Sequence, residues 1–218
     1  MKPRFGYICV PPPPPPHIST FAGNGSMYTQ GGDGGPATSA SLGQATCLTS
    51  DNQGNIYVGA QSPGSIRKIN TSGIIESIAG NGSSVFGGDG GPATAASFHN
   101  IVALTTDTTG NIFVADSNRI RVIRSGYVET YVGNGSTGYS GDGGPAINAT
   151  LGQLAHSIST DSAGNLYLQD SYNAVIRRVN SSGFIDTIAG NGSIGGELQV
   201  GSPATSIPIN PAYAMATL

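Results

Sequence analysis

Histidines and candidate nucleophiles are the first residues to consider for chemistry. The sequence has three histidines, His17, His99 and His156, and each stands in a different sequence context. A zinc site needs about three or four clustered ligands, so we expect no metal site and no cofactor. No Gly-x-Ser-x-Gly motif and no Cys–His pair stands out. We therefore expect no catalytic residues and a protein that is not an enzyme.

Aspartates within glycine-rich segments form a second candidate group. The segment Gly-Asp-Gly-Gly-Pro places them at Asp33, Asp89 and Asp142. Oxygen-rich loops can hold calcium, but calcium takes about six to eight oxygen ligands, and each segment offers one carboxylate. We favour an Asx-type turn in which the following proline ends the loop.

Arginines and a different set of aspartates also recur at regular intervals. The arginines follow an isoleucine at Arg67, Arg121 and Arg177. The aspartates open an Asp-x-x-Gly-Asn turn at Asp51, Asp107 and Asp161. Because a guanidinium group makes forked contacts with carboxylates, we expect these arginines to pair with the turn aspartates. The alternative is a ring of positive charge with one arginine from each repeat.

Acceptor sequences for N-glycosylation, Asn-x-Ser/Thr, are dense in this chain. They occur at Asn24, Asn70, Asn81, Asn134, Asn148, Asn180 and Asn191. Four of them share one position in the repeat, so glycans there would project from one side. The alternative is that a sequence rich in Asn, Gly, Ser and Thr forms such triplets by chance and that repetition multiplied one of them. We expect attached glycans and an extracellular or cell-surface location, although the first ten residues do not read as a signal peptide.

Two cysteines, Cys9 and Cys47, leave two alternatives open. They could form one disulfide, or Cys47 could be a small apolar core residue with a free thiol. Cysteine content alone does not settle the redox compartment.

The N-terminal segment 1–17 contains a run of six prolines: Pro11, Pro12, Pro13, Pro14, Pro15 and Pro16. Proline fixes φ and donates no hydrogen bond, so the run predicts a polyproline II rod. We favour a rigid spacer. The alternative is a ligand for an aromatic-lined groove in a partner protein.

The composition indicates which elements must position these groups. The chain has 218 residues, a net charge of −3 and 34 glycines. Glycine supplies the positive φ angles of tight turns, so this composition suits short strands joined by many turns. The few basic residues are scattered, which argues against a nucleic-acid partner. The sequence lacks an apolar run long enough to span a membrane.

One repeat organises residues 18–218. Asn-Gly-Ser recurs at Asn24, Asn81, Asn134 and Asn191, and the other anchors follow in the same order. Each unit parses into four strands, which describes a propeller blade. The second strands are predicted at Ile56–Ala60, Ile112–Asp116 and Leu166–Asp170, and the fourth at Ile74–Ala79, Tyr127–Val132 and Phe184–Ala189.

The predicted fold is therefore all-β: an NHL-type propeller array with three complete blades and a partial strand at each end, open or completed by association. The blades span about 43–80, 99–133 and 152–190, and the partial strands are 18–22 and 212–217. A ring ordinarily needs about four to eight blades. Open ends expose unpaired strand edges and apolar faces, which favours association.

The sequence resembles the NHL-repeat family of β-propellers over about residues 18–218. The resemblance rests on Ala79–Gly82, on Gly88–Thr94 with its Gly-Asp-Gly-Gly-Pro-Ala-Thr connector, on Asp107–Asp116 and on Arg119–Arg121. The first unit departs from the pattern at Gln61–Gly64, and the last connector lacks the Gly-Asp-Gly-Gly core. The resemblance implies a binding or scaffolding propeller, although a few relatives are enzymes such as the amidating lyases.

These observations predict a structural or interaction module, extracellular and N-glycosylated, that associates head to tail with other copies of itself. The partners would be other copies or other proteins, with glycans attached covalently. One alternative is a piece of a larger closed propeller that serves as a ligand-binding adhesion or sensor domain. Another is a propeller enzyme of the amidating-lyase or lactonase type.

Overall fold

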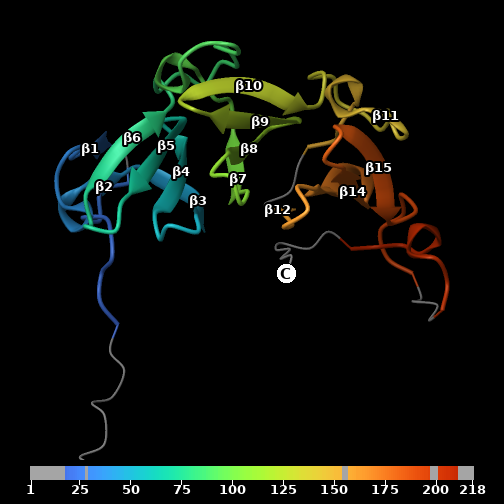
Figure 1. Cartoon of the computed structure of the whole chain (residues 1–218). Coiled ribbons are helices and arrows are strands. Elements are labelled where there is room, and N and C mark those ends of the chain that lie inside the picture. Colours follow the sequence, from blue (N-terminus) through green and yellow to red (C-terminus); the bar gives the residue numbers. More distant parts are fainter. Residues whose placement is uncertain (1–17, 28, 154–156, 197–200, 211–218) are drawn as a thin grey trace, which may run out of the picture.

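Three antiparallel sheets, two of four strands and one of five, form most of the protein. The structure is a computed structural model and describes residues 18–27, 29–153, 157–196 and 201–210. The sheets stand side by side in an arc, with the first strand of each on the concave side and the last on the convex side (Figure 1). We call them blades 1, 2 and 3.

The strands follow the chain in simple up-and-down order within each blade. Blade 1 consists of β3 (Gln44–Ser50), β4 (Ile56–Ser62), β5 (Ser65–Ile69) and β6 (Ile75–Ala79). Blade 2 consists of β7 (Ile101–Thr106), β8 (Ile112–Asp116), β9 (Arg119–Arg124) and β10 (Tyr127–Val132). Blade 3 consists of β12 (Ile158–Thr160), β13 (Leu166–Asp170), β14 (Val175–Val179) and β15 (Phe184–Ala189), with β11 (Gly144–Pro145) added along β15.

The predicted all-β fold of propeller-type blades is confirmed, and the sheets do not close into a ring. The predicted strand at residues 18–22 is wrong, because no strand forms there. A fourth strand pairs with the third strand of its own blade, and residues 18–22 have no such partner strand among the described residues. The other predicted end strand, 212–217, and the segment 1–17 lie outside the described residues.

Two apolar cores hold neighbouring blades together. One core joins blades 1 and 2 and includes Tyr57, Phe98 and Leu104. The second joins blades 2 and 3 and includes Phe113 and Leu168. A sheet that packs on both faces needs apolar residues without alternation, which explains why all five residues of β8 are buried.

A connector with the Gly-Asp-Gly-Gly-Pro sequence precedes each blade in the chain. In space it runs alongside the outer strand of that blade. In blade 2, Gly90 N–H donates to Val128 O and Ala93 N–H donates to Gly126 O. A short 3-10 helix then turns the chain inward: η1 (Ala37–Ser39), η2 (Ala93–Ala95) and η3 (Ala146–Asn148). The same device appears again after blade 3 as η5 (Ala204–Ser206). The connectors are therefore hydrogen-bonded along the outer strands of the array.

Glycine is required in these connectors by a close approach. Gly88 has a φ of +91°, and a Cβ there would lie 2.6 Å from Ala96 Cα. Any L side chain at this position would meet both backbone strain and a clash.

Candidate functional site

Among the described residues, the repeated arginines are the largest fully buried side chains. They bind different aspartates from those predicted. Arg121 contacts Asp89 at 2.7 Å and Arg177 contacts Asp142 at 2.5 Å, while Arg67 pairs with Asp33. The predicted pairing with Asp51, Asp107 and Asp161 is therefore wrong. The connector runs beside the outer strand, where Asp89 also accepts hydrogen bonds from Thr130, whereas the Asp-x-x-Gly-Asn turn joins the two innermost strands of its blade.

The connector aspartates are consequently more than turn residues. Partial burial raises the pKa of Asp142, but hydrogen bonds from Thr187 and Arg177 outweigh burial and hold this pKa below its ordinary value. The same arginine donates Nη1–H to Thr150 O and Nη2–H to Ser140 O. Each arginine thus clamps a connector onto its blade by charge-assisted hydrogen bonds.

The turn aspartates Asp51, Asp107 and Asp161 cap their own turns. Asp107 Oδ1 accepts hydrogen bonds from the N–H groups of Thr109 and Asn111. Gly110 follows with a φ of +86°. Asp51 also accepts a hydrogen bond from Tyr57, whose pKa rises to about 12 because of burial and this contact. The predicted turn is therefore formed, and in blades 1 and 3 its aspartate also accepts a hydrogen bond from a tyrosine of the following strand.

Blades 2 and 3 contain a second, buried carboxylate that blade 1 lacks. Asp116 Oδ1 accepts hydrogen bonds from the N–H groups of His99 and Asn100, and Asp170 Oδ1 accepts one from Gly152 N–H. Burial raises the pKa of both carboxyl groups. The equivalent position in blade 1 is Ala60. These aspartates fix the chain where it approaches the innermost strand.

The remaining sequence candidates do not assemble into a catalytic or metal centre in the part of the chain that the structure describes. His99 Nδ1 lies 2.8 Å from Ser84 O, and no group of His, Cys, Asp and Glu residues there could hold a metal ion. Burial raises the pKa of the free Cys47 thiol to about 11. Cys9, His17, His156 and the proline run Pro11–Pro16 lie outside the described residues.

The four connector asparagines of the glycosylation sequences make contacts that explain their repetition without glycans. Asn81 Oδ1 accepts from Ser83 N–H, and Asn81 Nδ2 donates to Ala95 O in η2. The equivalent asparagines repeat this pattern: Asn24, Asn134 and Asn191. At Asn70 and Asn180, Oδ1 instead accepts two backbone N–H groups of the turn that precedes the fourth strand.

The open face of blade 1 differs most from the rest of the molecule. Leu48, Leu104 and Ile158 occupy one register position, each opposite an apolar residue of the next strand. Leu104 and Ile158 are each 6% exposed because the preceding blade covers them, whereas Leu48 is 72% exposed. Blade 1 therefore presents to solvent the surface that blades 2 and 3 bury.

A groove of about 530 Å³ follows this face of blade 1. The groove is lined by Leu48, Ile56 and Val58 of blade 1 and by Phe21 of the segment that precedes the first connector. Phe21 is 62% exposed. Large apolar side chains gathered in an exposed groove indicate a binding surface. The repeat pattern predicts apolar faces at the open ends but does not single out these residues.

Hydrogen bonds between innermost strands show the same incompleteness. Thr106 Oγ1 donates to Ser50 O at 2.8 Å, and Thr160 Oγ1 donates to Thr106 O at 2.8 Å. Ser50 is the equivalent hydroxyl residue of blade 1. No blade precedes it among the described residues, so its hydroxyl group lacks the carbonyl acceptor that the other two have.

Comparison with known proteins shows the fold. The chain is similar to a structural genomics protein of unknown function from Bacteroides thetaiotaomicron (TM-score 0.60, 18% identity), covering 79% of this chain and 42% of that one. It is also similar to auxiliary nutrient binding proteins from Bacteroides thetaiotaomicron (TM-score 0.55, 17% identity, 81% of this chain and 43% of that one) and Bacteroides ovatus (TM-score 0.51, 14% identity, 74% and 43%).

This chain spans about two fifths of the length of each of these structures. No family model and no curated protein matches the sequence. The similarities therefore define a propeller-like class of fold. Across the described residues, no helix has the length and apolar character needed to cross a membrane.

Proposed function

We propose that this chain is a non-enzymatic binding module of the NHL-propeller type, and that the open face of blade 1 docks another propeller blade. The occupant that we propose is blade 3 of a second copy. The single observation that carries this proposal is the exposure of Leu48 at a position where Leu104 and Ile158 are buried by a neighbouring blade.

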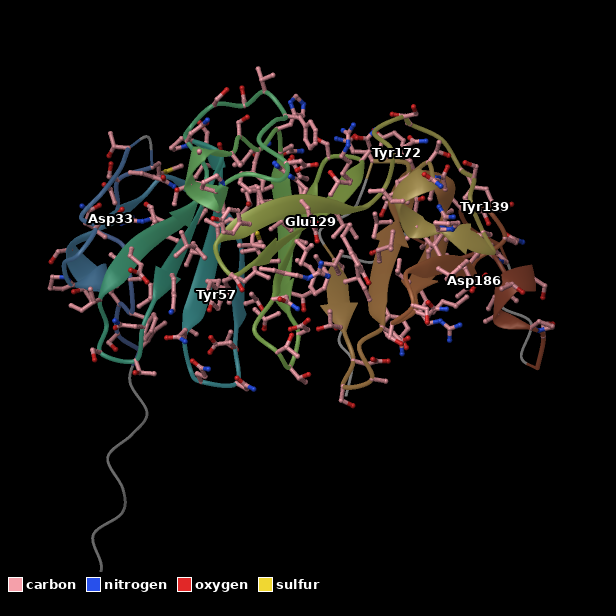
Figure 2. The ribbon with its side chains drawn as sticks, turned by 45° about the horizontal axis from the view of Figure 1, so that its top comes forward. Asp33, Tyr57, Glu129, Tyr139, Tyr172 and Asp186 are labelled. Carbon is pink, nitrogen blue, oxygen red and sulfur yellow. The ribbon has the colours of Figure 1, made fainter. Side chains whose placement is uncertain are left out.

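The two interfaces within the chain supply the template for this contact. On the side that faces the following blade, the second strand contributes Tyr57 in blade 1 and Phe113 in blade 2, and both are buried. Figure 2 labels Tyr57, which comes from β4. The equivalent residue of blade 3 is Tyr167 in β13, which is only partly buried. Blade 3 of one copy thus offers the surface that blade 1 of another copy lacks.

Successive contacts of this kind join copies head to tail. Such heterologous contacts close into a ring if the rotation per copy permits it and otherwise extend into a filament. The N-terminal connector already hydrogen-bonds to the outer strand β6 of blade 1, where Gly34 N–H donates to Ile75 O. The second copy would therefore approach the inner part of the face, where the groove lies.

We also propose an extracellular or cell-surface setting with N-linked glycans, on the density of acceptor sequences. Asn148 is the best placed of these residues, because it is exposed on η3 and its side chain makes no hydrogen bond within the described residues. Mass spectrometry of peptides from protein secreted by a eukaryotic cell would test this. A glycan on Asn148 is expected, and unmodified peptides at all seven sites would contradict it.

Further blades of a longer chain are the second candidate for the occupant. The observation that favours them is the length of the structures compared above, of which this chain spans about two fifths. The array would then be part of a closed propeller with a ligand-binding role.

Light scattering during size-exclusion chromatography would distinguish the candidates. We expect the chain to form dimers or larger species as its concentration rises. Leu48→Asp should abolish this association, because the docked state would bury an unpaired charge. The matched control is Val85→Asp on a connector, since Val85 is 71% exposed and lies away from the groove. A monomer at every concentration, or association that survives Leu48→Asp, would overturn the proposed self-association.

A further inference from the structure

Blades 2 and 3 carry different residues at the position where the third strand begins. In the strand register, Arg119 lies opposite Asp116 in blade 2, and Val175 lies opposite Asp170 in blade 3. Arg121 and Arg177 follow two residues later at matching register, so Arg119 and Val175 are equivalent. Blade 3 has therefore replaced a cation with a short apolar side chain.

In blade 2, the Arg119 guanidinium group occupies a well-defined place on the rim. It lies over the Phe86 ring at 4.1 Å from the ring centroid, and its Nη2–H group donates to Asn134 O at 3.2 Å. Gly135 lies so close that any Cβ there would overlap the guanidinium group. The buried Arg121 also lies over Phe86, at 4.8 Å from the centroid.

In blade 3, an equivalent ring, buried arginine and asparagine are present without the second guanidinium group, beside a longer β13–β14 connection that forms η4 (Ser171–Asn173). Tyr139 is the equivalent of Phe86, and the buried Arg177 lies over it at 5.2 Å from the centroid. Asn191 and Gly192 are the equivalents of Asn134 and Gly135. These residues line a groove of about 510 Å³, together with Val175 and Tyr172.

The groove has an open aromatic wall. Tyr139 is 51% exposed and Tyr172 is 72% exposed. Figure 2 shows both side chains on blade 3. The Tyr139 hydroxyl group is held by contacts with Thr187 and with the Asp142 carboxylate, which fix the ring in place. An aromatic ring and a backbone carbonyl group are the two features that Arg119 contacts in blade 2.

We propose that this groove of blade 3 binds a guanidinium group, taking the place that Arg119 fills from within the chain in blade 2. The group would stack on Tyr139 and donate to Asn191 O. Its source is either an arginine side chain of a partner protein or a small guanidinium compound. This site is separate from the open face of blade 1 and does not depend on self-association.

Binding can be measured by NMR titration with N-acetyl-arginine-amide, with the uncharged citrulline analogue as the matched control ligand. We expect saturable shifts with arginine and about tenfold weaker binding of citrulline, because a cation over an aromatic face is attracted by the ring. Tyr139→Leu should weaken arginine binding about two- to fivefold, whereas Leu48→Asp should leave it unchanged. A short peptide with a central arginine that binds at least tenfold more tightly than the amide would identify a protein partner as the source, and equal affinities would identify a small compound.

Two substitutions give each blade the residue type that the other blade has at this position. Val175→Arg should fill the groove from within, as in blade 2, and abolish binding, while Val175→Ile should retain it. Arg119→Val should open a second site on Phe86 and raise the stoichiometry from one to two. The Arg119→Val result decides the matter if Val175→Arg does not fold. No binding of arginine to the wild-type chain, equal binding of citrulline, or an unchanged stoichiometry in Arg119→Val would each overturn the proposal.

Discussion

Blade 1 and blade 2 are built from the same repeat and differ in what covers them. Leu104 of blade 2 lies in a core with Tyr57 of blade 1, whereas Leu48 of blade 1 faces solvent. Blade 2 also contains the buried Asp116, at the position of Ala60 in blade 1. The comparison shows that blade 2 buries this apolar position against its neighbour, whereas blade 1 leaves the equivalent position exposed in the part of the chain that the structure describes.

The largest expected effect concerns the arginine clamps. Arg121 Nη1 lies 3.8 Å from Asp116 Oδ2, and both side chains are fully buried. Arg121→Met should lower the free energy of unfolding by about 3–5 kcal/mol, because it leaves Asp116 buried without its cation. Arg67→Met should cost only about 1–2 kcal/mol, since blade 1 has no second buried carboxylate and the Asp33 side chain is 49% exposed. Chemical unfolding of both variants measures the difference. Equal losses would show that the second carboxylate does not matter.

The next effect separates the covered leucine from the open one. Leu104→Ala should destabilise the chain by about 2–5 kcal/mol, because it leaves a cavity between blades 1 and 2. Leu48→Ala should change stability by about 0.5 kcal/mol or less in dilute solution. Thermal and denaturant unfolding at low protein concentration checks both values. A large loss in Leu48→Ala would mean that the chain itself covers this face.

The smallest effect is a dependence on pH at the outer rim. The pKa of Asp142 is lowered in the folded state from its ordinary value of 3.8. Its contribution to stability is therefore complete above that value and is lost as pH falls through the lowered folded pKa. Asp142→Asn should cost about 1 kcal/mol at neutral pH, after allowance for solvent screening.

The difference between the wild type and Asp142→Asn should disappear in strong acid, because both side chains are then uncharged. Unfolding curves at neutral and at acidic pH test this, with Asp186→Asn on the adjacent outer strand β15 as a control. A difference that persists in acid would assign the effect to packing rather than to charge.

The strands were predictable because their signals are local. Ile112–Asp116 and Phe184–Ala189 form as the sequence predicted, after turns held by Asp107 and Asn180 respectively. The segment 18–22 has similar apolar residues but forms no strand. Pairing with a third strand decides the matter, and that information is not local.

The arginine partners were not predictable from spacing alone. Arg121 bonds Asp89, 32 residues earlier in the chain, rather than the nearer Asp107. The connector folds back across the outer strand, and only the three-dimensional path of the chain shows this. The groove of blade 3 was not predicted either. Aligning the repeats places Val175 at the position of Arg119, and this difference is the signal that could have revealed it.

The most direct test of the open face is hydroxyl-radical footprinting of Leu48 at increasing protein concentration. Val85 serves as the internal reference, because it is equally exposed, and Leu104 serves as the buried limit. We predict that Leu48 is oxidised as readily as Val85 in dilute solution, and that its oxidation falls toward that of Leu104 as copies associate. Oxidation of Leu48 that follows Val85 at every concentration would contradict docking at this face.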